Sequence, residues 1–159
     1  MQYGDIVNEE LSDLAQRIAD NIARNGQAAS GRTQQSLHVV EDDDSVTLYG
    51  REGFHSLERG VSPEEVKKDI MSFSRILYLW SQDKGISFSS DKERSSFAYL
   101  LARKIKREGT ALYRDGGRAD VYSNEIPTTV QRIRQRISAA FRLMVESINI
   151  NKPNAADNS

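Results

Sequence analysis

The sequence predicts an α+β fold: a helix-rich single domain of about four helices with a small antiparallel β-hairpin. Apolar residues recur at spacings of three and four along four long stretches, which is the period of an amphipathic helix. Two short stretches of alternating apolar and polar residues flank an acidic run at Asp42–Asp44, a pattern typical of a hairpin. The length of 159 residues suits one domain. We place this domain at residues 1–150 and expect a flexible polar tail at 151–159.

The first helix is predicted at residues 5–25, where Asn25-Gly26 ends it because glycine accepts the left-handed cap conformation. Its expected inner face consists of Val7, Leu11, Leu14, Ile18 and Ile22. The hairpin follows at residues 35–50. Since two strands alone are only marginally stable, it must lie on helices or pair with strands elsewhere in the chain or in another subunit.

The second long helix is predicted from Ser62 to about Asp83. Ser62 and Glu65 form a capping box, and Pro63 fits the first helical position. Because its apolar face is wide, we expect this helix to be the most buried one. That face consists of Val66, Ile70, Phe73, Ile76, Leu77, Leu79 and Trp80.

Two further helices follow. A second capping box at Ser90–Glu93 opens a helix that continues to about Arg107. The last helix starts near residues 124–127 and continues to about Ile148, and its arginines fall off the apolar stripe. The expected inward residues are Phe97, Leu100, Leu101 and Ile105 in the first, and Ile126, Val130, Ile133, Ile137, Phe141, Met144 and Ile148 in the second.

Between these two helices, residues 109–124 form a long polar loop, and such loops are usually functional or disordered. Because Tyr113, Val121 and Tyr122 argue against disorder, we expect residues 110–123 to dock on another surface and to become ordered on assembly.

Charge is distributed unevenly along the chain. Residues 1–65 hold five Lys/Arg against 13 Asp/Glu, a net charge of −8, and residues 103–142 hold ten against four, a net charge of +6. One interpretation is two solvated faces that differ in sign. The other is a polar subunit whose acidic side meets the basic side of a neighbour, as in the head-to-tail contacts that build rings.

The sequence contains no catalytic motif that we recognise, and we predict no enzyme and no cofactor. With no cysteine, disulfides and thiolate chemistry are excluded. His55 and Glu58 are spaced as two metal ligands on one helical turn, but a third ligand with matching spacing is missing, so we predict no metal site. We expect no signal peptide, because the N-terminus has neither a basic n-region nor an apolar h-region. We expect no membrane partner, because no apolar run approaches the length of a bilayer span.

The basic segment 103–142 gives the alternative function: a cytoplasmic nucleic-acid-associated protein. Basic side chains there can neutralise phosphates, with aromatic residues interleaved. The sequence pI of about 6.1 argues against a dedicated DNA binder. The candidate basic surface consists of Arg103, Lys104, Lys106 and Arg107.

From Ser30 to Tyr122 the chain resembles a family of tailed-bacteriophage proteins, the tail-completion or head–tail joining proteins related to the minor tail protein Z type. Gly31 to Leu37 matches a Gly-x-(Leu/Thr)-x-x-Ser-Leu element, and Phe54 to Gly60 matches an aromatic residue followed by Leu/Val-Glu-x-Gly. Trp80 to Ile86 matches Trp-x-x-x-Lys-Gly-Ile, and Ala98 to Thr110 matches a helical stretch that ends in Gly-Thr. Family members often continue with an aromatic-Pro segment, where this chain has Gly116-Gly117.

The resemblance implies a non-catalytic virion protein, made in the host cytoplasm, that completes or joins the head–tail connection. It implies a ring of six or twelve copies around the DNA channel. The expected partners are further copies, other neck, portal-adjacent or tail proteins, and passing DNA read without sequence specificity. Within this interpretation, the candidate subunit or partner contacts are Phe54, Leu57, Glu58, Gly60, Tyr113, Arg114, Arg118 and Tyr122.

Overall fold

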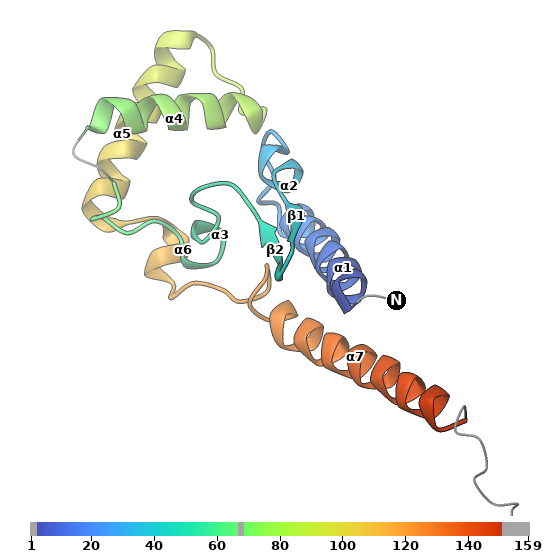
Figure 1. Cartoon of the computed structure of the whole chain (residues 1–159). Coiled ribbons are helices and arrows are strands. Elements are labelled where there is room, and N and C mark those ends of the chain that lie inside the picture. Colours follow the sequence, from blue (N-terminus) through green and yellow to red (C-terminus); the bar gives the residue numbers. More distant parts are fainter. Residues whose placement is uncertain (1–2, 67–68, 151–159) are drawn as a thin grey trace, which may run out of the picture.

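The computed structural model describes residues 3–66 and 69–150. Within them the fold is α+β and helix-rich with one two-stranded antiparallel sheet, which confirms the predicted class. The predicted tail at 151–159 lies outside the described residues. The long helices are α1 (Tyr3–Arg24), α4 (Ile70–Asp83), α5 (Asp91–Glu108) and α7 (Glu125–Ile150), and α2 (Arg32–Gln35), α3 (Ser56–Arg59) and α6 (Ala111–Arg114) are single turns (Figure 1).

Helix α1 organises the body of the protein. Gly26 ends the helix with φ at 67°, and the next N–H, from Gln27, donates to the Ile22 carbonyl at 3.0 Å, which is the Schellman pattern. Leu14, Ile18 and Ile22 are buried as predicted, whereas Val7 and Leu11 are half-buried.

The hairpin lies against α1, which confirms that it packs on a helix. Strands β1 (His38–Asp42) and β2 (Ser45–Tyr49) pair in antiparallel register, with His38 opposite Tyr49 and Asp42 opposite Ser45. The core forms where α1 meets the hairpin and the loop before α7. Leu14, Ile18, Ile22 and Val121 are its buried centre, surrounded by Leu11, Ala28, Leu37, Leu48, Phe54, Leu57 and Tyr122.

Helices α4 and α5 form a helical hairpin that stands apart from this body (Figure 1). Small residues occupy the contact between them, since Ser81, Ala98 and Ala102 are fully buried. Small side chains let two helices approach closely. The α4–α5 contact therefore does not require the large apolar residues, which lie on other faces of the two helices. The expectation that α4 is the most buried helix is therefore wrong, because Ile76, Leu79 and Trp80 are exposed. Leu100 on α5, expected inside, is exposed as well.

The start of α4 also differs from the prediction. The capping box forms, with the Ser62 N–H donating to Glu65 Oε2 at 2.7 Å and the Glu65 N–H to Ser62 Oγ at 3.3 Å. It caps only a turn at residues 63–66, and α4 begins at Ile70. Asp69 is the N-cap of α4, because its carboxylate accepts from the Met71 N–H at 2.9 Å. The second predicted capping residue, Ser90, does cap α5.

Helix α7 runs antiparallel along α1 and turns its polar side toward it. Thr129 is buried, and Arg132 and Arg136 reach acidic side chains of α1. The apolar stripe of α7 lies one residue further along, about 100° around the helix. The prediction that this stripe faces inward is wrong for most of its length, because Ile126, Val130, Phe141, Met144 and Ile148 are exposed. In the described chain, no helix has the length and apolar character that crossing a membrane requires.

Candidate interaction surfaces

Glu58 is a buried carboxylate that holds the loop before α7. Its residue exposes 3% of its surface, and Oε1 accepts from the N–H groups of Val121 at 3.0 Å, Tyr122 at 2.7 Å and Ser123 at 2.9 Å. Oε2 accepts from the Ser123 hydroxyl. The Glu58 carbonyl accepts from the Arg118 N–H at 2.8 Å. The side-chain carboxylate and the backbone carbonyl of Glu58 therefore both hold residues 118–123 in place.

These hydrogen bonds outweigh the cost of burying the charge. Burial by itself would raise the pKa of Glu58, but the Ser123 hydroxyl and the three backbone N–H groups lower it below its usual value. Burial and the adjacent Glu58 charge raise the pKa of Tyr122. Glu58 is thus an ionised internal anchor, which corrects its prediction as a partner contact.

Gly60 is placed where two segments approach closely. It is buried with φ at 72°, and a Cβ there would lie 2.4 Å from the Tyr113 backbone nitrogen and 2.5 Å from Thr110 Oγ1. Next to it, the Thr110 N–H donates to the Val61 carbonyl at 3.0 Å, and the Val61 N–H donates to Thr110 Oγ1 at 2.9 Å. Gly60 therefore permits a close approach within the chain, and its role as a subunit or partner contact stays a prediction.

The loop at 110–123 is structured in the single chain, which corrects the expectation that it becomes ordered only on assembly. Thr110 caps the short helix α6 by accepting from the Tyr113 N–H at 3.3 Å. Gly117, with φ at 81°, lies against the Glu58 carbonyl, so close that a Cβ would be 2.7 Å from that oxygen. Gly117 thus permits a close approach of the two backbones that a larger residue would obstruct.

The other predicted contact residues lie partly at the surface. Tyr113 is exposed, Arg114 is exposed and pairs with Glu108 at 2.8 Å, and Arg118 pairs with Asp120 at 2.5 Å. Phe54, Leu57 and Tyr122 are half-buried on the core, and the rings of Phe54 and Tyr122 lie 5.4 Å apart. Their availability to a partner is therefore limited to their outer edges.

Opposite charges meet within one chain along α1 and α7. Arg136 Nη1 lies 3.0 Å from Glu10 Oε1, and Arg132 Nε lies 3.0 Å from Glu10 Oε2, outside hydrogen-bond geometry. Arg132 also pairs with Asp13 at 2.9 Å, and Arg17 with Glu125 at 3.0 Å. Part of the charge in the acidic and basic segments is therefore paired within one chain, and contact between the remaining charges across subunits stays a prediction.

The candidate basic surface on α5 is only partly free for other partners. Arg103 lies over the Tyr99 ring at 5.9 Å, and Arg107 pairs with Glu108 at 2.5 Å. Lys104 is exposed and Lys106 half-buried.

A groove of about 900 Å³ separates the α4–α5 hairpin from the body, and we call it the α4 groove. Phe73, Ile76, Leu77 and Trp80 line its α4 wall and share one face of the helix, because they are three or four residues apart. Ile76 exposes 59% of its surface and Trp80 37%. The groove also contains the cations Arg32, Arg51, Lys104 and Arg114, with Asp83 as an acidic neighbour that pairs with Arg32 at 2.9 Å.

The opposite end of the molecule presents a second apolar surface. The last turns of α7 extend beyond the first turn of α1 (Figure 1). Four large exposed side chains between residues 141 and 148 form what we call the α7 stripe. Phe141 exposes 53% of its surface and Ile148 59%. The α7 stripe consists of Phe141, Met144, Val145 and Ile148.

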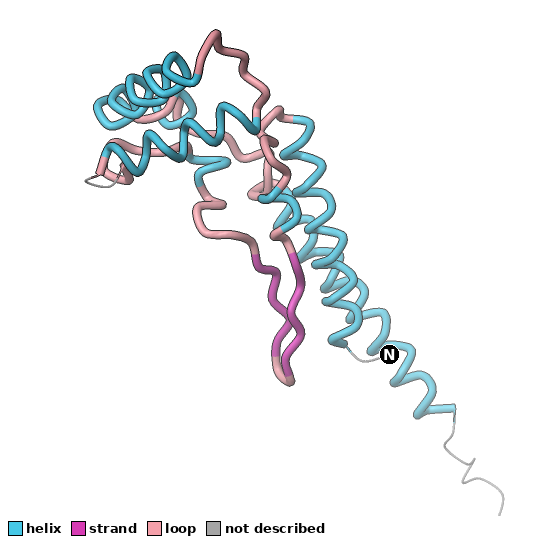
Figure 2. Tube along the Cα trace, turned by 90° about the horizontal axis from the view of Figure 1, so that it is seen from above, coloured by secondary structure: helices cyan, strands magenta, loops and turns pink. Residues whose placement is uncertain are grey.

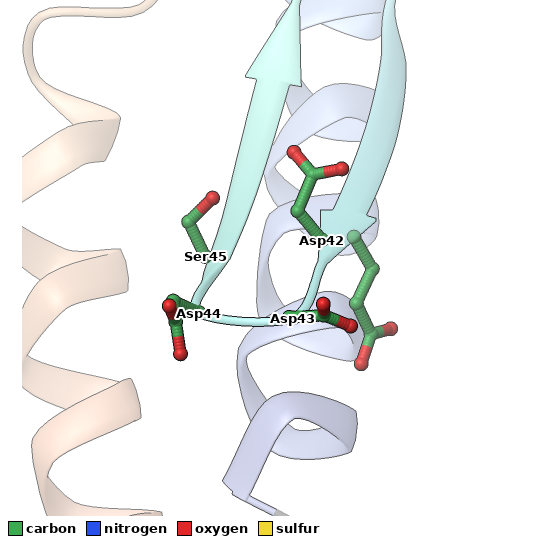
Figure 3. Close-up of a pocket in the computed structure, with 5 residues that line it drawn as sticks. Asp42, Asp43, Asp44 and Ser45 are labelled. Atoms are coloured by element: carbon green, nitrogen blue, oxygen red, sulfur yellow. The ribbon is translucent and has the colours of Figure 1, made fainter.

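The hairpin turn forms an acidic tip beside the first turns of α1. Glu41 reaches α1 by accepting from Asn8 Nδ2 at 2.9 Å. Figure 3 shows the carboxylates of Asp42, Asp43 and Asp44 pointing in different directions around an open hollow. Across residues 3–66 and 69–150, no three His, Asp or Glu side chains are placed to hold a metal ion. The spaced pair His55 and Glu58 is separated, because His55 Nε2 contacts Glu65 at 3.2 Å while Glu58 points inward.

No protein-family model, curated protein or solved structure matches the chain.

Proposed function

We propose that this protein is a structural subunit of a tailed-bacteriophage virion, which joins or completes the head–tail connection as a ring of identical copies. The family resemblance between Ser30 and Tyr122 supports the assignment to the head–tail connection of a phage virion. The observation that carries the assembly role is the outward apolar stripe of α7, since large exposed apolar surfaces mark sites of protein–protein contact.

The placement of the quoted motifs supports the proposal further. The Leu-Glu-x-Gly element around Glu58 and the Gly-Thr element at Thr110 are about fifty residues apart in sequence, yet they meet at Gly60 and Val61. Their residues are joined by hydrogen bonds within the chain, and the Glu58 carboxylate holds the loop before α7. Such use of a buried carboxylate favours a scaffold over a reactive site.

Nucleic-acid association is the second candidate, and exposed Lys104, Arg103 and Arg107 on α5 favour it. Against it, Arg132 and Arg136 of the same basic segment are held by α1 acids. DNA affinity of the full chain that falls steeply with salt would support this candidate. No binding at low salt would reject it.

The test of the proposed function is genetic. In the phage that encodes this chain, deletion of its gene is expected to yield heads and tails that are not joined in electron micrographs. Expression of the wild-type chain from a plasmid should restore joined particles, and its peptides should appear in purified virions by mass spectrometry. Normal joined particles from the deletion strain would contradict the proposal.

A further inference from the structure

We propose that the α7 stripe of one copy inserts into the α4 groove of the next copy, so that identical chains associate head to tail. The inference rests on the assembly role proposed above and names the two surfaces that carry it. The occupant is thus a second copy of this chain. The first reason is that one chain leaves large apolar side chains exposed on α4 and on the last turns of α7. These two segments lie at opposite ends of the ribbon (Figure 1).

The shapes of the two surfaces are those of a ridge and a groove. Phe141, Met144, Val145 and Ile148 have spacings of three, one and three, which gathers them on one side of α7. A helix that lays such anchors into an apolar groove is a recurring mode of recognition. The groove volume of about 900 Å³ is similar to that of small-molecule pockets, about 300–1,000 Å³. The groove therefore has room for several large side chains.

Charge at the two ends is complementary. The acidic tip, Glu41 to Asp44, extends in the same general direction as the C-terminal half of α7, away from the α4–α5 hairpin (Figure 2). Four cations line the α4 groove: Arg32 and Arg114 pair with Asp83 and Glu108, whereas Arg51 and Lys104 form no ion pair with a described residue. When the α7 stripe of one copy enters the groove of another, its acidic tip is brought toward those cations. Such complementarity steers encounter and fixes orientation.

The contact is heterologous, because the two surfaces lie on different parts of one chain. A heterologous contact closes into a ring or continues as a filament, whereas a symmetric contact between two α7 stripes stops at a dimer. This difference separates the proposal from its nearest competitor. It also allows a test in which each of two variants keeps one working surface.

The stripe variant carries Phe141→Asp and Met144→Asp. The groove variant carries Ile76→Asp and Leu79→Asp, where Leu79 is a further residue that lines the α4 groove. All four side chains are exposed in the single chain, so both variants should fold, as circular dichroism would verify. Matched controls are Leu143→Asp on α7 and Met71→Asp on α4, each 67% exposed on the opposite side of its helix. Native mass spectrometry and light scattering of the full chain measure the state of assembly.

We expect the wild type and both controls to form oligomers of more than two copies. Each double variant alone should be monomeric, with self-association weakened by more than about tenfold, because buried anchors dominate interface energies. Mixed in equal amounts, the two variants should form a one-to-one heterodimer that grows no further, since only one pair of working surfaces remains.

Dimers of the groove variant alone would overturn the proposal in favour of a symmetric α7 contact. A monomeric wild type at all concentrations, or oligomers unaffected by either double variant, would overturn it as well. The proposed function fails separately, on the deletion phenotype and the virion peptides. A chain that joins heads to tails yet assembles through other surfaces would sink this inference alone.

Discussion

The Glu58 carboxylate accepts a hydrogen bond from the Tyr122 N–H at 2.7 Å, across 64 residues of chain. The same oxygen accepts from the two neighbouring N–H groups, so one side chain replaces the backbone partners that a loop before a helix lacks. This contact ties the turn that contains α3 to the start of α7. It also places Val121 in the core beside Ile18 and Ile22.

Replacing Glu58 should therefore destabilise the whole fold. We expect Glu58→Gln to lower the free energy of unfolding by about 2–3 kcal/mol, because it removes the charge from hydrogen bonds in a buried site. Urea denaturation followed by circular dichroism measures the effect. The control Glu64→Gln changes an exposed side chain and should have little effect. Equal stability of the two variants would contradict the assigned role of Glu58.

The lowered pKa of Glu58 predicts how the stability of the fold changes with pH. Because the folded-state pKa of Glu58 lies below its ordinary value of 4.5, the unfolded chain binds more protons between the two pKa values. Its contribution is therefore fully present above the ordinary pKa and is lost as pH falls through the lowered one. The stability difference between the wild type and Glu58→Gln should shrink as pH drops below about 4. A difference that stays constant down to pH 2 (about the lowest practical value) would refute this.

Gly53 and Gly60 allow the cost of a positive φ to be separated from the cost of a close atomic contact. Gly53→Ala tests a positive φ in open space, since its Cβ would meet nothing within 4 Å, and we expect a cost of about 1 kcal/mol. Gly60→Ala has a similar φ but meets the Tyr113 nitrogen, so we expect a loss of more than about 3 kcal/mol in the free energy of unfolding. Similar losses for both variants, measured by urea denaturation, would show that the close approach is unimportant.

The charged contact between α1 and α7 should depend on two arginines together. Glu10 is buried, with its side chain 4% exposed, and Arg132 and Arg136 both approach it. The double variant Arg132→Gln with Arg136→Gln leaves this carboxylate unpaired and should lower the thermal midpoint far more than Arg134→Gln, an exposed neighbour. Adding Glu10→Gln should recover part of the loss. No recovery would mean that the arginines act mainly by packing.

The small residues between α4 and α5 give a further prediction. Ala98 is fully buried where the helices meet, so Ala98→Leu should force them apart and reduce the free energy of unfolding by about 1–3 kcal/mol. Ser95→Leu on the exposed side of α5 is the control. Unchanged stability in Ala98→Leu, measured by urea denaturation, would contradict close packing of the two helices.

Local sequence signals predicted the elements well. The positions of α1, the hairpin, α5 and α7 follow from apolar spacing, Gly26 and the Ser90 cap, all of which act within a few residues. The start of α4 differs from the prediction because the Ser62 box caps a turn at residues 63–66, whereas α4 begins at Ile70. The competing cap at Asp69 is equally local, so it was a signal that could have been found.

The arrangement of those elements was harder to predict. An apolar stripe shows that a helix is amphipathic, but the pattern alone leaves open whether that stripe faces the same chain or another molecule. The spacing of Arg132 and Arg136, matched by the acids Glu9, Glu10 and Asp13, is a signal that could have indicated the α1–α7 contact. Apart from the Ser123 hydroxyl, the partners of Glu58 left no such signal, because they are backbone N–H groups present at nearly every residue.

The hydrogen bonds between Val61 and Thr110 lie at the base of the α4–α5 hairpin, where the two segments that carry it meet. Tilting the hairpin about this base would move the α4 groove relative to the α7 stripe of the same chain. In a head-to-tail assembly, the relation between those surfaces sets the rotation from each copy to its successor. The circumference of a ring built from this chain would then depend on the backbone and side-chain hydrogen bonds of two residues at the base of the hairpin.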